Sequence, residues 1–259
     1  MINLSQLNQL QILLFALVFL RCSSFIMSAA LFGASGINTH FKILFALVLS
    51  MVLFPNLASH NADLTYVNEN LVILVIREVL VGLSIGVISR SFFFAVSMTG
   101  DLVSMSLGLG AAQLFNPLSG TQSQIMDQFF TWLSLMIFLS LGGHHILINA
   151  ISSSFELIPL AQNKFSTGPF AAIVGDYYKL LIVAIQISAP VLISMVLTNL
   201  AMGILGRTVP QINVLVTSFP ISILLGLGVL VLTVPMWSQE MSHLLDITST
   251  ELMKFMKAI

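Results

Sequence analysis

Charged and polar residues are sparse along this chain, and they divide it into long apolar stretches. Because about 20 apolar residues cross the hydrocarbon core of a membrane as a helix, the pattern predicts six candidate spanning segments, at 10–32, 41–58, 71–99, 128–150, 179–202 and 212–236. Breaks are predicted between them, at 33–40, 55–70, 100–127, 159–176 and 206–213. No internal repeat is visible, so we expect an all-α fold in one membrane domain over residues 1–259.

The last segment, 238–259, has a different pattern. Its apolar positions recur at helical spacing, while its charged residues fall mostly on the rest of the helical wheel. The predicted apolar face consists of Met241, Leu244, Leu245, Thr248, Leu252, Phe255 and Ile259. We therefore expect an amphipathic C-terminal helix, which packs on its own bundle, docks on a partner or lies at the membrane interface.

Composition supports a membrane protein. Hydrophobic residues make up 57% of the 259 positions and charged residues only 7%, whereas soluble domains have about 25% charged residues. The net charge of −1 gives no reason to expect a nucleic-acid partner. The single cysteine, Cys22, excludes an internal disulfide and offers no metal cluster.

Five charged residues lie inside or beside the apolar segments: Arg21, Arg77, Glu78, Arg90 and Asp101. Each would cost about 2.5–3.5 kcal/mol at the bilayer centre, so each must pair, face water or lie outside the hydrocarbon. Arg77 and Glu78 are adjacent and point about 100° apart on a helix, so they are expected to reach different neighbours. Arg90 and Asp101 share a face but lie about three turns apart, too far to touch. An ion or proton pathway is one interpretation. Salt bridges between subunits of a protein-lined assembly are favoured, because no series of carboxylates and histidines follows one helix.

Glycine and proline positions suggest close packing and bent helices. Gly82 and Gly86 are four residues apart, with Arg90 continuing their face, and small residues at this spacing let a second helix approach closely. That helix could belong to this chain or to another subunit. Pro190 and Pro220 interrupt apolar segments, which occurs at transporter binding sites and at bends in a bundle.

The glycine-rich stretch 106–124 raises the question of a nucleotide site, and its residues argue against one. Gly108 and Gly110 are followed by Gln113 where a third glycine would be needed, and no basic residue or predicted strand accompanies them. The sequence also lacks the common hydrolase, zinc-protease and P-loop motifs. His144 and His145 are expected to diverge on a helix and have no acidic residue or cysteine within four positions. We therefore expect no enzyme activity, cofactor or metal site.

Four stretches, taken in order, resemble the FliR family of type III protein export-gate subunits: 19–33, 110–120, 142–160 and 189–230. The most specific part is GRTVPQIN followed by the tripeptide SFP, within 206–220. This family signature contains Arg207, Pro210, Gln211, Asn213 and Pro220. Two positions depart from the family pattern, because many members have Asp-Pro in place of Asn116-Pro117 and Gly in place of Ser218. Injectisome relatives share the Pro-Gln-Asn signature, so a virulence export gate stays open as an alternative.

The resemblance implies a fold, a location and partners. Family members form helical hairpins with Pro- and Gly-broken helices inside a hetero-oligomeric helical gate of the bacterial inner membrane and flagellar basal body. The implied partners are FliP, FliQ and FlhB, membrane lipid, and the unfolded flagellar proteins that the gate exports. In such a gate the apolar segments need not be simple spans. If the six segments were simple spans, an orientation that places 55–70 outside would also place Lys164, Lys254 and Lys257 outside. That contradicts the rule that Lys and Arg are more frequent in cytoplasmic loops, and segments that are not simple spans would explain the conflict.

The resemblance also implies that 106–124 is a loop that blocks the pore. Its glycines, Gly108, Gly110 and Gly120, would give flexibility, and Leu114, Phe115 and Pro117, with Asn116, would give an apolar plug. Irregular backbone at membrane depth is tolerated only where protein or a water-filled cavity surrounds it. Three alternatives remain: an ordinary surface turn, a secondary transporter that uses Arg90, Asp101 and the proline-containing helices, and a structural nucleus that only templates assembly.

Overall fold

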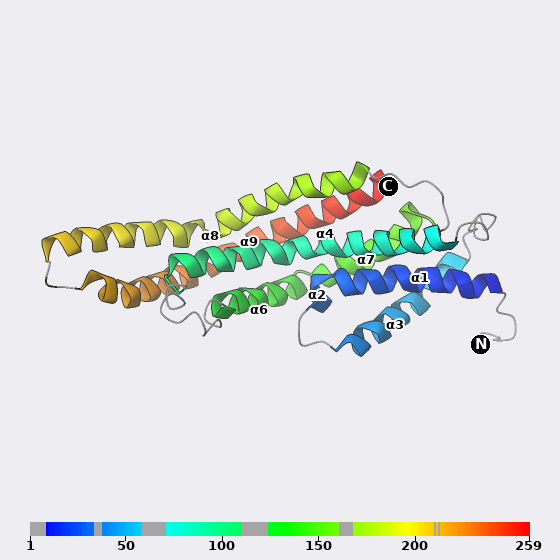
Figure 1. The fold of residues 1–259 in the computed structure, drawn as a ribbon, viewed down its shortest axis with the longest axis horizontal. Helices are drawn as coiled ribbons and strands as arrows, with labels where there is room; N and C mark the ends of the chain where they lie inside the picture. The colour runs from blue at the N-terminus through cyan, green and yellow to red at the C-terminus, as the bar shows by residue number, and fades with distance from the viewer. Residues whose placement is uncertain are drawn as a thin grey trace. The chain divides into compact units, whose positions relative to one another are not determined.

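The computed structural model describes residues 9–33, 38–58, 71–109, 124–160, 168–209, 211 and 213–259. Its helices, labelled in Figure 1, are α1 Gln9–Ser28, α2 Ala30–Gly33, α3 Thr39–Ala58, α4 Leu71–Ser106, α6 Gln124–Ser140, α7 Gly143–Leu157, α8 Gly168–Thr208 and α9 Val214–Ala258. Within these ranges the regular structure is helical throughout and contains no strand, which confirms the all-α prediction.

The contacts divide the chain into two compact units. Unit 1 consists of Met1–Ser91, Gly142–Asp176 and Ile247–Ile259, and unit 2 consists of Phe92–Leu141 and Tyr177–Asp246. The helices α4, α8 and α9 contribute residues to both units. The prediction of a single domain stays a prediction.

In unit 1, α1 packs against α3 and against the first half of α4. Phe15 of α1 meets Phe54 of α3 edge-on, with ring centroids 5.5 Å apart. Leu17 of α1 and Leu74 of α4 are both buried and form a small core, which Leu13, Val75 and Leu160 extend. Because these apolar side chains recur at helical spacing, each helix turns one face toward its neighbour.

In unit 2, aromatic side chains fill the space among α4, α6 and α9. Phe92 of α4 and Phe138 of α6 have ring centroids 5.3 Å apart, and Phe130 of α6 lies 4.9 Å from the Trp237 ring of α9. The α8 helix is joined to α4 by a polar contact, because Thr99 Oγ1 donates to the Ala184 carbonyl at 3.3 Å.

The six candidate spanning segments do not correspond one to one to spanning helices in the structure. Four helices of the described residues are long and apolar enough to cross a membrane, and a fifth span results if the bent pair of α6 and α7 is counted as one. That pair, Gln128–Ser140 and Gly143–Leu157, bends by 69°. Gly142 lies at the bend with φ 74°, a left-handed conformation that glycine adopts without strain. The predicted segment 41–58 lies within α3, Thr39–Ala58, which continues past Pro55.

The predicted ends of the later helices are also corrected. Pro190 lies inside α8, while Pro220 and Pro235 lie inside α9, and each helix continues past its proline. The segment 212–236 and the C-terminal segment therefore belong to one helix of 45 residues. Of the predicted apolar face, Ile259 is half-buried. The six other members are buried within the chain: Met241, Leu244, Leu245, Thr248, Leu252 and Phe255.

Candidate functional site

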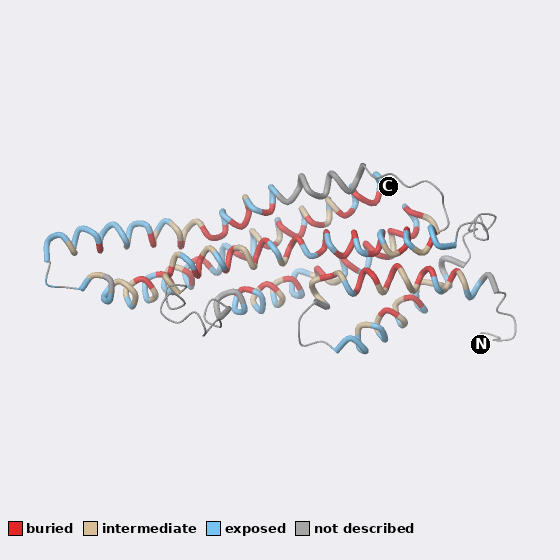
Figure 2. The backbone as a smooth tube through the Cα atoms, viewed as in Figure 1, coloured by how far each residue is buried: buried red, intermediate tan, exposed pale blue. Residues whose placement is uncertain are grey.

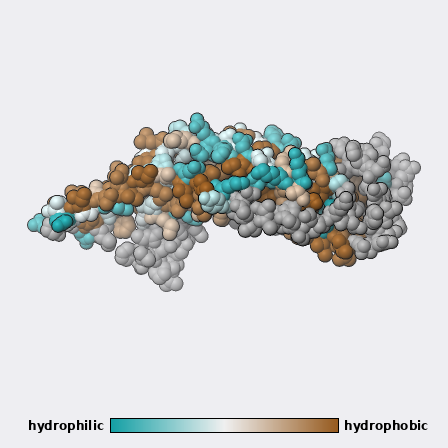
Figure 3. Space-filling model, turned by 90° about the horizontal axis from the view of Figure 1, so that it is seen from above, coloured by the Kyte–Doolittle hydropathy of each residue, from teal (hydrophilic) through white to brown (hydrophobic). Residues whose placement is uncertain are grey.

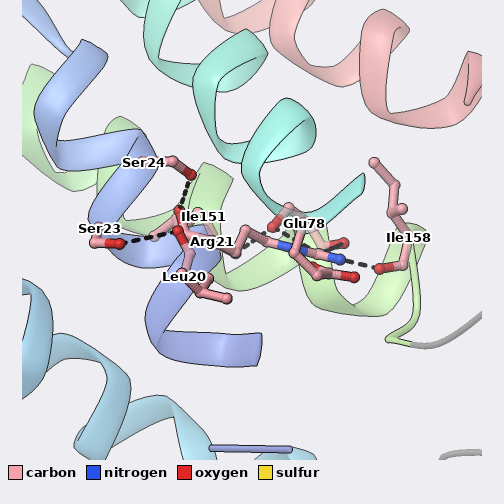
Figure 4. A network of polar contacts seen from close by, with 8 residues as sticks. Leu20, Arg21, Ser23, Ser24, Glu78, Ile151 and Ile158 are labelled. Carbon is pink, nitrogen blue, oxygen red and sulfur yellow. Dashed lines mark hydrogen bonds and ion pairs between the residues drawn. The ribbon is translucent and has the colours of Figure 1, made fainter. Parts of the chain in front are cut away.

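The centre of unit 1 contains a buried ion pair. Arg21 Nε of α1 donates to Glu78 Oε2 of α4 at 2.5 Å, and both side chains are fully buried (Figure 4). The guanidinium also reaches the end of α7, where Nη1 donates to the carbonyls of Ser154 and Ile158, each at 3.0 Å. Its carbon lies 4.4 Å above the Phe155 ring, close enough for a cation–π interaction.

This geometry makes Arg21 a cap for the α7 C-terminus as well as an ion-pair partner. The last carbonyls of a helix have no partner within the helix and carry partial negative charge, so a cation there is favourable. Removing Arg21 would leave the Glu78 carboxylate and the Ile158 carbonyl without this buried donor, while the Ser154 carbonyl would keep the Ile158 N–H at 2.9 Å. The Arg21 side chain therefore joins α1, α4 and α7 within this chain, whereas the sequence analysis favoured a salt bridge between subunits.

Of the other charged residues singled out from the sequence, Arg77 interacts electrostatically with both members of this pair. Arg77 is buried, and Arg90 and Asp101 are exposed on α4. Glu78 reaches across to Arg21 of α1. Arg90 does not share the surroundings of Gly82 and Gly86, which are both buried.

Gly82 and Gly86 let α1 lie directly against α4 within unit 1. A Cβ added at Gly82 would overlap Ser24 Oγ, and one added at Gly86 would overlap Ser28 Oγ and lie 2.8 Å from the Phe25 carbonyl. The sequence left open whether the partner helix belongs to another subunit; in the structure it belongs to this chain.

We expect Gly82→Ala to destabilise the chain by about 1–3 kcal/mol, the usual cost of overpacking a close contact. The matched control is Gly203→Ala in α8, because a Cβ added there meets nothing within 4 Å. Thermal unfolding of the detergent-purified protein measures both variants. Equal midpoints for the two variants would contradict the close approach of α1 and α4.

In unit 2, α4 ends in a defined turn at the start of the candidate loop. The Gly108 N–H donates to the Met105 carbonyl at 3.1 Å, and the Leu109 N–H donates to the Ser104 carbonyl at 3.2 Å. Gly108 has φ 76°. This is the Schellman arrangement, in which a left-handed glycine closes the last helical turn and redirects the chain.

Gly108→Ala is therefore expected to be destabilising, because a residue with a Cβ pays about 1–3 kcal/mol in the left-handed region. The variant Gly110→Ala provides a comparison at the neighbouring glycine of the same stretch. Thermal unfolding measures the difference, and an unchanged midpoint for Gly108→Ala would contradict the turn.

This turn packs against α9. A Cβ added at Gly108 would lie 3.1 Å from Phe219 Cε1, and Leu107, which is fully buried, fills the space that a Cβ on Gly226 would occupy. Phe219 and Gly226 are seven residues apart, so both lie on one face of α9. Phe219 is the central residue of the SFP tripeptide, and sequence reasoning did not connect that tripeptide with the stretch 106–124.

The remaining signature residues lie around the hairpin between α8 and α9. Arg207 is in the last turn of α8, where its charge complements the helix dipole. Asn213 caps α9, because its Oδ1 accepts the Val216 N–H at 3.4 Å. Gln211 and Pro220 are exposed. Several predicted residues lie outside the described residues: Gly110, Leu114, Phe115, Asn116, Pro117, Gly120 and Pro210.

The structure corrects one detail at the start of α7. His144 and His145 do not diverge; their ring centroids lie 4.1 Å apart in the first turn of that helix. Across the described part of the chain, no group of three His, Cys, Asp or Glu side chains is placed to hold a metal ion.

Large apolar side chains remain exposed along the long helices. On α8 they run from Tyr178 to Leu205, and on α9 most of them lie between Val216 and Met236. The end of α8 next to the hairpin is pale blue over most of its length in Figure 2, and the surface of that hairpin is largely brown, or hydrophobic, in Figure 3. A surface of this kind needs lipid or protein to cover it.

Comparison with known proteins gives consistent matches over most of the chain. The family model of bacterial export proteins, family 1, matches residues 12–247. The flagellar biosynthetic protein FliR of Bacillus subtilis (strain 168) is 34% identical over 212 residues, 81% of each chain. FliR of Caulobacter vibrioides is 29% identical over 241 residues, 92% of this chain and 96% of the relative. FliR of Aquifex aeolicus is 30% identical over 230 residues, 88% and 87% of the two chains.

Proposed function

The chain belongs to the bacterial export proteins, family 1, and is a subunit of the flagellar protein export apparatus; on that premise we propose that it helps to form and close the conduit through which unfolded flagellar proteins leave the cell. The protein is a membrane protein of the flagellar system and associates with other components of the apparatus. The proposed role is mechanical and requires no cofactor or covalent chemistry.

The length of the exposed apolar surface on α4 carries this proposal. The helix has 36 residues, which at about 1.5 Å per residue is about 54 Å. Even at a tilt of about 40°, the upper end of the usual range, it would extend about 41 Å along the membrane normal, against a hydrocarbon core of about 30 Å. Exposed apolar side chains occur along its whole length, from Leu71 to Met105. Lipid tails alone cannot cover such a surface, so part of it requires other protein.

The exposed Arg90 supports the same conclusion. It lies between the apolar stretches of α4, where contact with lipid tails would cost about 2.5–3.5 kcal/mol. A neighbouring subunit or a water-filled conduit would remove that cost. As the family resemblance implies, the proposed neighbours are the gate subunits FliP and FliQ, with FlhB associated, in an assembly in the inner membrane at the flagellar basal body.

Within the conduit, the loop that contains 110–120 is proposed to act as the plug. A pore for unfolded chains must stay closed to ions at rest, and the apolar side chains Leu114, Phe115 and Pro117 would exclude water from a narrow passage. The turn at Gly108 supports this role, because α4 ends there at a defined point and not by fraying. An arriving export substrate would displace the loop, so no nucleotide chemistry is needed at this site.

Export in living cells tests the proposed function. In a flagellated strain that lacks this chain, flagellar subunits should disappear from the culture medium, and expression of the chain should restore them. The control is secretion of a protein that uses the general secretory pathway, which should be unchanged. Normal flagellar secretion together with loss of small-solute uptake would instead support a secondary transporter.

A further inference from the structure

We propose that Leu107, Gly108, Phe219 and Gly226 form an anchor that fixes the start of the plug loop on α9. This loop anchor rests on the proposed function, since it assigns residues that position the closing loop. It also assigns a physical role to two α9 residues, Phe219 and Gly226, that have no place in the ion pair or in the hairpin caps.

The contact between Leu107 and Gly226 is the first part of the anchor. Leu107 is the residue before the left-handed turn, and its side chain is fully buried. Its Cδ2 lies where the Cβ of any other residue at 226 would be, and Met195 Cε of α8 lies 3.4 Å from the same point. A leucine methyl therefore occupies a hole that exists only because α9 has a glycine there.

The contact between Gly108 and Phe219 is the second part. Two carbon atoms of the Phe219 ring lie 3.1 and 3.3 Å from the position of a Cβ at Gly108. Glycine is therefore favoured at position 108 for two reasons. The φ of 76° disfavours a residue with a side chain, and the Phe219 ring leaves little room for one. The ring covers the turn at the point where the chain leaves α4.

The two contacts together restrain the turn in position and in direction. Phe219 and Gly226 are two helical turns apart on α9, and Leu107 and Gly108 are consecutive in the chain. A single contact would leave the end of α4 free to pivot, whereas two separated contacts oppose rotation. The consequence is that α9 controls where the loop begins, so a change in α9 should reach the plug without touching it.

A size exchange tests the anchor in the assembled gate. Gly226→Leu should expel the Leu107 side chain, and Leu107→Ala in the same protein should make room for the new leucine. A spin label on Leu114→Cys reports the mobility of the loop, and the native Cys22 does not interfere because it is fully buried. The matched control is Gly228→Leu on the same helix, where a Cβ meets nothing within 4 Å.

We expect Gly226→Leu to add a mobile component to the spin-label spectrum and to raise the resting ion leak toward that of a gate without 110–118. The double variant should lose most of both effects, and Gly228→Leu should show neither. If Gly226→Leu prevents assembly, Leu107→Ala alone replaces it and should show the same two changes to a smaller extent.

Two further outcomes separate the anchor from the proposed function. An unchanged spectrum in the assembled Gly226→Leu and Leu107→Ala proteins would overturn the anchor, whatever the leak. If deletion of 110–118 causes no leak while the variants still mobilise the label, the plug is wrong and the anchor stands.

Discussion

Deleting residues 110–118 should convert a closed gate into a conducting one while leaving the assembly intact. The segment contains Leu114, Phe115 and Pro117, whose apolar side chains are proposed to exclude water and ions from the conduit. The helices that hold the chain together make their contacts elsewhere, through Arg21 and Glu78 in unit 1 and the aromatic cluster in unit 2. Removing the segment should therefore affect closure and spare folding.

The leak is measured as resting conductance of the purified gate in planar bilayers, with subunit composition checked on the same preparation. A matched control replaces 110–118 by an equally long Gly-Ser linker, which retains chain length and loses the apolar side chains. Both variants should conduct, because closure is proposed to depend on those side chains. If the gate with the linker shows no resting conductance, the chain only templates assembly.

Removing one partner of the Arg21–Glu78 pair should cost about 3–5 kcal/mol of stability, because the other side chain then loses its buried ion-pair partner. Glu78→Leu leaves the Arg21 guanidinium next to Phe155, and Arg21→Met leaves the buried Glu78 carboxylate with the electrostatic interaction of Arg77. The double variant should recover part of the loss, since a buried pair replaced by apolar residues is often tolerated. Recovery should be incomplete, because Arg21 also donates to the carbonyls of Ser154 and Ile158.

Unfolding in detergent by heat or denaturant gives the three free energies. Lys254→Met serves as the control, because Lys254 makes an exposed ion pair with Glu251 at 2.8 Å and such pairs contribute about 0–1 kcal/mol. Single variants as stable as Lys254→Met would contradict the structural role of the buried pair.

The sequence predicted the helices well because apolar periodicity and the scarcity of charge are local signals. The ends of α8 and α9 were harder to predict. Pro190 and Pro220 suggested interruptions, yet α8 and α9 continue past them. The bend at Gly142 was not predicted. Glycine occurs often in membrane helices, and the sequence does not show which glycine adopts the left-handed conformation.

The candidate site was predictable only in part. Arg21 and Glu78 were recognised as charges that need partners, but their pairing spans 57 positions and cannot be read from one sequence. Glycine spacing indicated a close helix contact at Gly82 and Gly86 without identifying α1 as the partner. Gly226 and Gly228 gave only a weak indication of close packing, and the contact between Leu107 and Gly226 could not be predicted, because it depends on how α4 ends against α9.

The central claim is that this chain is one of several unlike subunits around a conduit, and that those subunits cover much of its apolar surface. The native mass of the particle extracted from flagellated cells tests it most directly. We predict a mass that exceeds the 28.2 kDa chain and is accounted for only by adding different membrane proteins. A stable particle whose mass equals this chain alone, or a simple multiple of it, would contradict the account.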